Sequence, residues 1–276
     1  MRELQCKNSS SVIETPHKYY VHQGSAEILT YLKLLCRAED IGEMSIMHTN
    51  LESFPEEITE IVPLKTLTLL GINIKRILES IGRLKKLEEL NVAQNVIEFL
   101  PNEICELQSL LELDVSTNLL TSLPVSLSQC KLLTSLQLSH NKFQEWPPCI
   151  FDLVSIQMLS FSNNRLELVP EGISKLTTLK QLFVQQNSLL TVSRSVEHLL
   201  MLEVVDLSHN SLSTITVYFG ACPQIRRIRR VDLPLLEMKL SRMSALSDGE
   251  FMKELRVMYA DFVAQNAAKA RSSTGS

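Results

Sequence analysis

The 276-residue chain is poor in glycine, with only 8, and aromatic residues make up 5% of it. With so few glycines, we do not expect the glycine-rich loops that bind phosphate groups. No stretch of 18 apolar residues occurs, so we predict no membrane insertion. The first 20 residues also lack the apolar core of a signal peptide. The net charge of −4 provides no basic field for nucleic acid. These absences predict a soluble, cytoplasmic protein.

The six cysteines show no pattern typical of a metal site, because no two of them have the spacing of metal ligands. Cys130 and Cys222 occur where related segments carry Ile or Leu, which indicates small buried hydrophobic residues. We therefore expect free thiols, which are typical of a reducing compartment.

A 23-residue period dominates the chain from residue 41 onward and recurs eight times without insertion or deletion. Numbering each unit from 1, slots 1, 4, 6, 11, 14, 18 and 21 are apolar in all eight units, which makes 56 positions. The units begin at Ile41, Leu64, Leu87, Leu110, Leu133, Ile156, Leu179 and Leu202, and a degenerate ninth begins at Ile225. Such a period predicts stacked copies of one structural unit.

Within a unit, the alternation around slots 4 and 6 predicts a short strand whose slots 3 and 5 face outward. One strand per unit would stack into a parallel sheet. Slot 9 is Asn in six consecutive units, and we expect these amides to form a buried ladder that bonds open backbone groups. The six are Asn95, Asn118, Asn141, Asn164, Asn187 and Asn210. Five units carry proline in slot 15, where the strand-side loop should end.

The unit reads LxxLxLxxNxLxxLPxxIxxLxx, and its clearest copy runs from Leu87 to Leu107 with Asn95 and Pro101 in place. This pattern resembles the leucine-rich repeat over residues 41–233. Its 23-residue LPxxI form resembles the intracellular class of the Ras-suppressor, Shoc-2 and LAP scaffolds such as Scribble and Erbin. The resemblance implies an α/β fold: a curved leucine-rich repeat solenoid with a parallel sheet on the concave face. It also implies a binding scaffold, often for small GTPases, phosphatase subunits, or polarity and cytoskeletal partners.

The ends of such an array need caps, because the terminal repeats would otherwise expose their core. We predict a loose segment over residues 1–24 and a capping helix over 25–40, with Ser25 as N-cap and Ile28, Leu32 and Leu35 on its apolar face. In the ninth unit Arg230 occupies core slot 6, which marks the point where the sheet meets solvent or an overlying element.

A second capping segment is predicted over residues 234–270, followed by a disordered tail over 271–276. Ser247 and Glu250 have the spacing of a capping box at the start of its helix. Phe251, Leu255, Met258 and Phe262 then fall on one helical face. A lid on the last repeat is the favoured interpretation, and a helix offered to a partner is the alternative.

No catalytic constellation is apparent. His48, His140 and His209 share slot 8, but they lie in units one, five and eight, and positions three units apart are separated by on the order of 15 Å at the ~4.8 Å strand spacing. That separation is too large for a shared metal ion. We expect no enzyme activity, no cofactor and no metal.

The outward strand positions predict where a partner binds. An acidic zone (Glu88, Glu89, Glu112 and Asp114) is followed by apolar Met158, Phe183 and Val204, and then by a basic end (Arg226, Arg227 and Arg229). Clustered outward apolar residues are candidate anchors, although single exposed apolar residues are common. The arginines could instead pair with acids of the C-terminal helix. The predicted protein-binding residues are Gln137, Met158, Ser160, Arg165, Gln181, Phe183, Val204 and Asp206.

These observations together predict a monomeric, cytoplasmic, non-enzymatic scaffold or adaptor that binds a protein on its concave face, in small-GTPase or phosphatase signalling. One alternative is a structural component of a cytoskeletal or polarity assembly. A substrate-recognition subunit of an enzyme complex is a further alternative.

Overall fold

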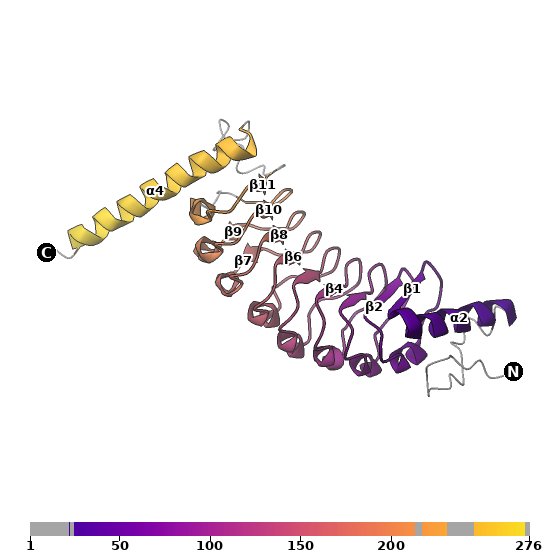
Figure 1. The fold of residues 1–276 in the computed structure, drawn as a ribbon. Coiled ribbons are helices and arrows are strands. Elements are labelled where there is room, and N and C mark those ends of the chain that lie inside the picture. The colour runs from indigo at the N-terminus through magenta and orange to yellow at the C-terminus, as the bar shows by residue number, and fades with distance from the viewer. Residues whose placement is uncertain (1–21, 23–24, 213–216, 231–245, 274–276) are drawn as a thin grey trace. The chain divides into compact units, whose positions relative to one another are not determined.

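The computed structural model describes residues 22, 25–212, 217–230 and 246–273 (Figure 1). The chain divides into two compact units. The first comprises residues 1–142 and 147–153, and the second comprises residues 143–146 and 154–276. Each unit consists of stacked coils, most of which contain a strand of the main sheet and one short 3₁₀ helix.

In the first unit, helix α2 (Ser25–Ile41) precedes five parallel strands. The strands are β1 (Glu43–Met47), β2 (Thr66–Leu70), β3 (Glu89–Asn91), β4 (Glu112–Asp114) and β5 (Ser135–Gln137). Each strand pairs with the next at an offset of one repeat, as in Glu43 opposite Thr66 and Thr66 opposite Glu89. The 3₁₀ helices are Glu56–Glu60, Glu79–Arg83, Asn102–Glu106, Val125–Gln129 and Pro148–Asp152.

In the second unit, four parallel strands follow the same rule: β6 (Met158–Ser160), β8 (Gln181–Phe183), β10 (Val204–Asp206) and β11 (Arg227–Arg229). A separate two-stranded sheet pairs β7 (Leu168–Val169) with β9 (Thr191–Val192). The 3₁₀ helices are Glu171–Lys175, Arg194–His198 and Val217–Ala221. Helix α4 (Asp248–Ser273) completes the unit.

The proline of slot 15 sets up the 3₁₀ turn in the units that carry it. Pro101 is extended, with φ −70° and ψ 154°, and its carbonyl accepts the amide of Ile104 at 3.2 Å. The carbonyl of Ile104 then accepts the amide of Leu107 at 3.2 Å. Proline suits this position because its φ is fixed near the required value and its missing N–H is not needed before a helix.

The predicted core is confirmed. Of the 56 apolar slots, all are buried except Ile41, which is 50% exposed, and Ile215, which lies outside the described residues. Ile41 differs because it is the last residue of helix α2 and no earlier coil covers it. The regular burial explains why the repeat tolerates no insertion, since one extra residue would move every later slot off the core.

The asparagine ladder is also confirmed. Asn118 is buried; its Oδ1 accepts the amide of Ile97 at 2.9 Å, and its Nδ2 donates to the carbonyls of Val92 at 3.0 Å and Val115 at 3.1 Å. Asn95 and Asn141 make the equivalent bonds one unit before and one unit after. Each amide therefore links its own coil to the preceding one.

A feature that the sequence did not indicate lies one residue before this ladder. Slot 8 has a positive φ between 52° and 61° in all eight units. The residues are His48, Gly71, Gln94, Thr117, His140, Asn163, Gln186 and His209. Because only glycine, and to a lesser degree Asn and Asp, adopts this conformation readily, most units hold strained backbone there.

Helix α2 begins near the predicted residue, but its buried face differs from the prediction. Tyr31, Leu35 and Ala38 are buried, whereas Ile28 and Leu32 are only half-buried. Tyr31 can be buried because its hydroxyl donates to Oε1 of Glu57 at 2.7 Å. The proposed N-cap contact of Ser25 involves a side chain that lies outside the described part of the chain.

The expectation that all cysteines are free is wrong for Cys36, which is disulfide-bonded. Cys105, Cys130, Cys149 and Cys222 are free. The cysteines therefore do not support a reducing compartment.

Candidate binding surface

The strands of the second unit present two outward rows of side chains. The slot 3 row runs through Met158, Gln181, Val204 and Arg227, and the slot 5 row runs through Ser160, Phe183, Asp206 and Arg229. Each row crosses β6, β8, β10 and β11 with one residue per strand. Neighbouring positions in a row are thus separated by about one strand spacing, ~4.8 Å.

The apolar members of this surface are less exposed than the sequence suggested. Met158, Phe183 and Val204 are half-buried. Gln181 and Arg165 are exposed. A half-buried aromatic ring keeps one face available to a ligand while its orientation is held by the sheet.

Two predicted contact residues are buried instead of outward-facing. Ser160 is 8% exposed and Asp206 is 5% exposed. The Oδ1 of Asp206 accepts the amide of Ser208 at 3.0 Å, and Ser160 Oγ lies 3.3 Å from Ser162 Oγ. Asp114 makes the same local bond to the amide of Ser116 at 2.9 Å. Small polar residues in slot 5 thus fold back on their own strand ends, which limits the area they offer a partner.

The arginines at and just before β11 divide into paired and unpaired side chains. Arg226 forms an ion pair with Glu203, and Arg229 lies 3.8 Å from Oδ2 of Asp206. The side chain of Arg227 is exposed and has no ion-pair partner within the described part of the chain. The strand edge therefore carries more positive charge than its acids neutralise.

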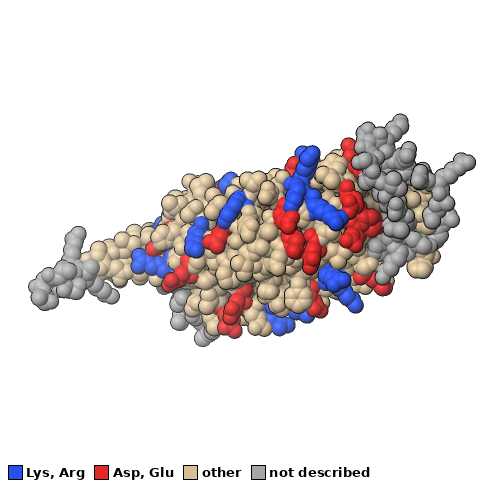
Figure 2. Space-filling model, turned by 90° about the horizontal axis from the view of Figure 1, so that it is seen from below, with Lys and Arg blue, Asp and Glu red and all other residues tan. Residues whose placement is uncertain are grey.

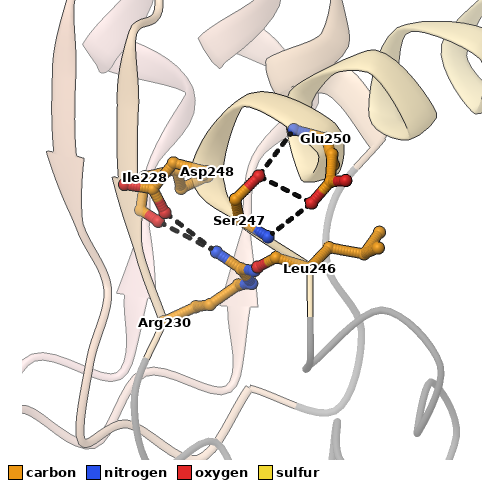
Figure 3. Close-up of polar contacts among 6 residues, drawn as sticks. All are labelled: Ile228, Arg230, Leu246, Ser247, Asp248 and Glu250. Carbon is orange, nitrogen blue, oxygen red and sulfur yellow. Dashed lines mark hydrogen bonds and ion pairs between the residues drawn. The ribbon is translucent and has the colours of Figure 1, made fainter.

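Arg230, the arginine in core slot 6, meets an overlying element, as predicted. Its side chain donates to the carbonyls of Ile228 at 3.2 Å and Leu246 at 2.7 Å and to Oδ1 of Asp248 at 3.2 Å (Figure 3). Asp248, the first residue of helix α4, thus pairs with Arg230. Among the described residues, the outward Arg226, Arg227 and Arg229 make no ion pair with that helix.

Helix α4 packs on the last coil. The capping box is confirmed, because Ser247 Oγ bonds the Glu250 carboxylate at 2.7 Å while the amide of Glu250 donates back at 3.4 Å (Figure 3). Phe251 and Leu255 are buried, whereas Met258 and Phe262 are half-buried. Gly220 permits the close approach, since a Cβ there would lie 2.5 Å from the carbonyl oxygen of Leu255.

Gln137 lies in the first unit, on strand β5, where it lines a shallow hollow of about 120 Å³. The polar lining of the hollow comes from strands β2 to β5. It consists of Thr66, Thr68, Glu89, Asn91, Glu112, Asp114 and Gln137. The sequence placed the acidic residues on this face but gave no indication that the face is hollowed there.

Metal-binding groups and thiols were the candidate chemical features of the described residues. Among them, no group of three or more His, Cys, Asp or Glu side chains could hold a metal ion. Burial raises the pKa of the Cys130 and Cys149 thiols to about 11 and that of Cys222 to about 12. Such thiols are almost fully protonated at neutral pH and are poor nucleophiles.

The surface seen from below in Figure 2 carries charges of both signs. Figure 2 shows small clusters in which Lys and Arg adjoin Asp and Glu, with uncharged surface between them. In the first unit, ion pairs join successive coils, such as Arg83 with Glu60 and Lys85 with Glu106. Exposed pairs of this kind contribute little to stability.

Comparison with known proteins agrees with the repeat. Sequence families described as leucine rich repeats match residues 85–143 and 155–176. The chain has a leucine-rich repeat fold. The predicted α/β fold class is therefore confirmed, and leucine-rich repeat domains generally bind proteins on such sheets. Comparison with curated proteins gives no match. None of the described helices is long and apolar enough to span a membrane.

Solved leucine-rich repeat structures resemble part of the chain. The plant peptide hormone receptor RGFR1, in complex with RGF2, is 26% identical over 68% of this chain with a TM-score of 0.57. A TDR receptor is 26% identical over 65% of the chain with a TM-score of 0.58. PEPR1-AtPEP1 is 23% identical over 70% of the chain, with a TM-score of 0.57, and shows the shared fold alone. The chain spans 30%, 32% and 29% of these three proteins, respectively.

Proposed function

We propose that the chain is a non-enzymatic interaction scaffold that binds a segment of another protein across the outward face of β6, β8, β10 and β11. The observation that carries this proposal is the zigzag formed on three successive strands by Met158 and Val204 of the slot 3 row and Phe183 of the slot 5 row. Diagonal neighbours on a sheet lie roughly 7–8 Å apart, within reach of long and aromatic side chains. They therefore form one apolar strip on an otherwise polar face.

A rigid sheet suits this task because its side chains are held before the partner arrives, so little conformational entropy is lost on binding. Aromatic residues surrounded by polar positions are also frequent binding hot spots. The proposed contact residues are Met158, Arg165, Gln181, Phe183 and Val204, with buried Ser160 and Asp206 supporting the strand ends. Gln137 is a separate candidate contact on β5. RGFR1, a peptide hormone receptor with similar repeats, gives a precedent for a protein ligand.

The cellular setting is also a proposal. The eight uniform 23-residue units and the slot 15 prolines favour the intracellular LPxxI class, and with it a monomeric cytoplasmic adaptor in small-GTPase or phosphatase signalling. Since Cys36 is disulfide-bonded, this inference rests on the repeat and not on the cysteines. The alternative is a structural component of a cytoskeletal or polarity assembly. Stable co-sedimentation with such an assembly at high salt would favour that alternative.

The test is affinity capture from extracts of cells that express the protein, followed by comparison of variants. The variant Phe183→Ala/Met158→Ala should lose the partner while keeping the wild-type circular dichroism spectrum. Phe99→Ala is the matched control, because Phe99 is 65% exposed but belongs to the first unit. Unchanged capture by the folded double variant would exclude this surface.

A further inference from the structure

We infer that the surface binds an extended peptide segment with an apolar side chain and, two residues away, an aspartate or glutamate. This inference rests on the proposed function, since it specifies the partner of the same surface. It combines the apolar strip of Met158, Phe183 and Val204 with the charge of strand β11. The two features lie on adjoining strands, so one short segment can contact both.

The charge balance at β11 favours a carboxylate. Arg226, Arg227 and Arg229 are exposed at and just before this strand, and among the described residues two acids pair with them. Glu203 pairs with Arg226. Asp206 already accepts the amide of Ser208 and lies 3.8 Å from Arg229, which leaves that arginine weakly held and 58% exposed. With Arg227 unpaired among the described residues, the edge retains about one unneutralised positive charge.

The spacing of the rows fits a peptide that crosses the strands. Val204 lies directly opposite Arg227 in the slot 3 row, and Phe183 is two strands away from Arg229 in the slot 5 row. At the usual strand spacing, Val204 and Arg227 are separated by about 5 Å, and Phe183 and Arg229 by about 10 Å. In an extended peptide, side chains on the same side are about 6.6–7 Å apart, a distance that lies between these two separations. An apolar residue seated on Phe183 and Val204 would thus bring the carboxylate two residues away to Arg227.

Arginine is well suited to this contact because its planar guanidinium can bind a carboxylate through two parallel hydrogen bonds. A basic partner residue would instead meet the unneutralised arginine and be repelled. The apolar strip supplies the contact area, whereas the arginines orient the segment and accelerate its encounter with the surface.

The experiment is selection of peptides from a displayed library of random 12-residue sequences on the complete chain. Three baits are compared: the wild type, Phe183→Ala, and the charge reversal Arg227→Glu/Arg229→Glu. The wild type should enrich sequences in which an apolar residue and an Asp or Glu are two positions apart. The charge-reversed bait should enrich Lys or Arg at that second position. For a selected peptide measured by fluorescence anisotropy, Arg227→Ala should weaken binding about tenfold, typical of losing a charge-assisted hydrogen bond.

The outcomes separate this inference from the proposed function. Peptides that require Phe183 but show no acidic preference, and no reversal on the charge-reversed bait, would overturn the inference and leave the proposed function standing. Peptides that bind equally to Phe183→Ala, or no enrichment at all, would overturn both. Analytical ultracentrifugation of the free chain adds a further check: a dimer that dissociates on Phe183→Ala substitution would identify a second copy as the occupant and contradict the inference.

Discussion

The guanidinium of Arg230 lies over the ring of Phe251, with 3.9 Å between Cζ and the ring centroid. This contact joins the end of strand β11 to the first turn of helix α4, within the second unit. An arginine in a core slot would be costly alone. Here its charge is compensated by Asp248, two carbonyls and an aromatic face, so the degenerate slot serves as the attachment point of the helix.

Replacing Arg230 by Ala should therefore release helix α4. The variant loses the bonds to Asp248 and the Leu246 carbonyl together with the ring contact, and we expect a loss of about 2–4 kcal/mol in the free energy of unfolding. Hydrogen exchange of amides in residues 251–259 should accelerate most. Arg229→Ala, at an exposed arginine, is the control and should change stability by less than about 1 kcal/mol. Unaltered exchange in helix α4 would contradict the attachment role.

The capping box makes the start of helix α4 sensitive to acid. The Ser247 hydroxyl and then its amide hydrogen-bond the Glu250 carboxylate, and these bonds lower its pKa below the ordinary 4.5. A lowered folded-state pKa gives stability that is present above the unfolded pKa and is lost as the pH falls through the folded value. The stability difference between wild type and Glu250→Gln should thus be present at pH 7 and disappear on acidification below about 4.5. Urea unfolding of both proteins from pH 7 to 3 measures it, and a pH-independent difference would argue against the box.

Much of the fold follows from the sequence because its determinants are periodic. The apolar slots, the slot 9 asparagines and the slot 15 prolines repeat the same chemistry at each turn of the chain, so each copy supports the interpretation of the others. Arg230 indicated the end of the array for the opposite reason, because it is charged at a slot that is apolar in every earlier unit.

The remaining features depend on contacts that no periodic pattern encodes. The positive φ of slot 8 is shared by His, Gly, Gln, Thr and Asn, so residue type does not reveal it. The alternating inside–outside pattern treats Asp206 as outward, but its carboxylate accepts the amide of Ser208 two residues on, and the side chain is buried. Tyr31 is buried because of Glu57, in the next coil of the chain. These are local or cross-coil hydrogen bonds, and they adjust the face on which the candidate site lies.

The asparagine ladder should be a major source of stability between neighbouring coils. Asn118→Ala leaves the buried amide of Ile97 without its side-chain acceptor. The carbonyls of Val92 and Val115 each lose one of two side-chain donors and keep the other, from Asn95 and Asn141 respectively. An unsatisfied buried amide costs about 1–3 kcal/mol, so we expect a loss of about 2 kcal/mol. Asn102→Ala, at an exposed position, should have almost no effect. Chemical denaturation gives the size of the loss, and faster exchange of the Ile97 amide would locate it; equal stabilities for the two variants would refute the ladder's role.

Thr117 is the one β-branched residue among the eight slot 8 positions. Its φ is 52°, and a β-branched side chain is poorly suited to a positive φ. Its side chain is exposed, so a substitution there removes no packing. Its amide donates to the carbonyl of Ser139 at 2.8 Å, and its carbonyl accepts the amide of Asn95 at 3.1 Å. These backbone hydrogen bonds do not depend on the residue type. Asparagine already occupies the same slot at Asn163 with φ 55°.

Thr117→Asn should consequently stabilise the chain by about 1 kcal/mol, since a left-handed conformation costs most residues roughly 1–2 kcal/mol and Asn less. The expected rise in Tm is about 2–4 °C for a chain of this size. Thr121→Asn, at an exposed threonine outside the positive-φ set, controls for the general effect of the change and should give no gain. Thr117→Val keeps the β-branch and should also give none. A stability increase shared by all three variants would show that relief of backbone strain is not its cause.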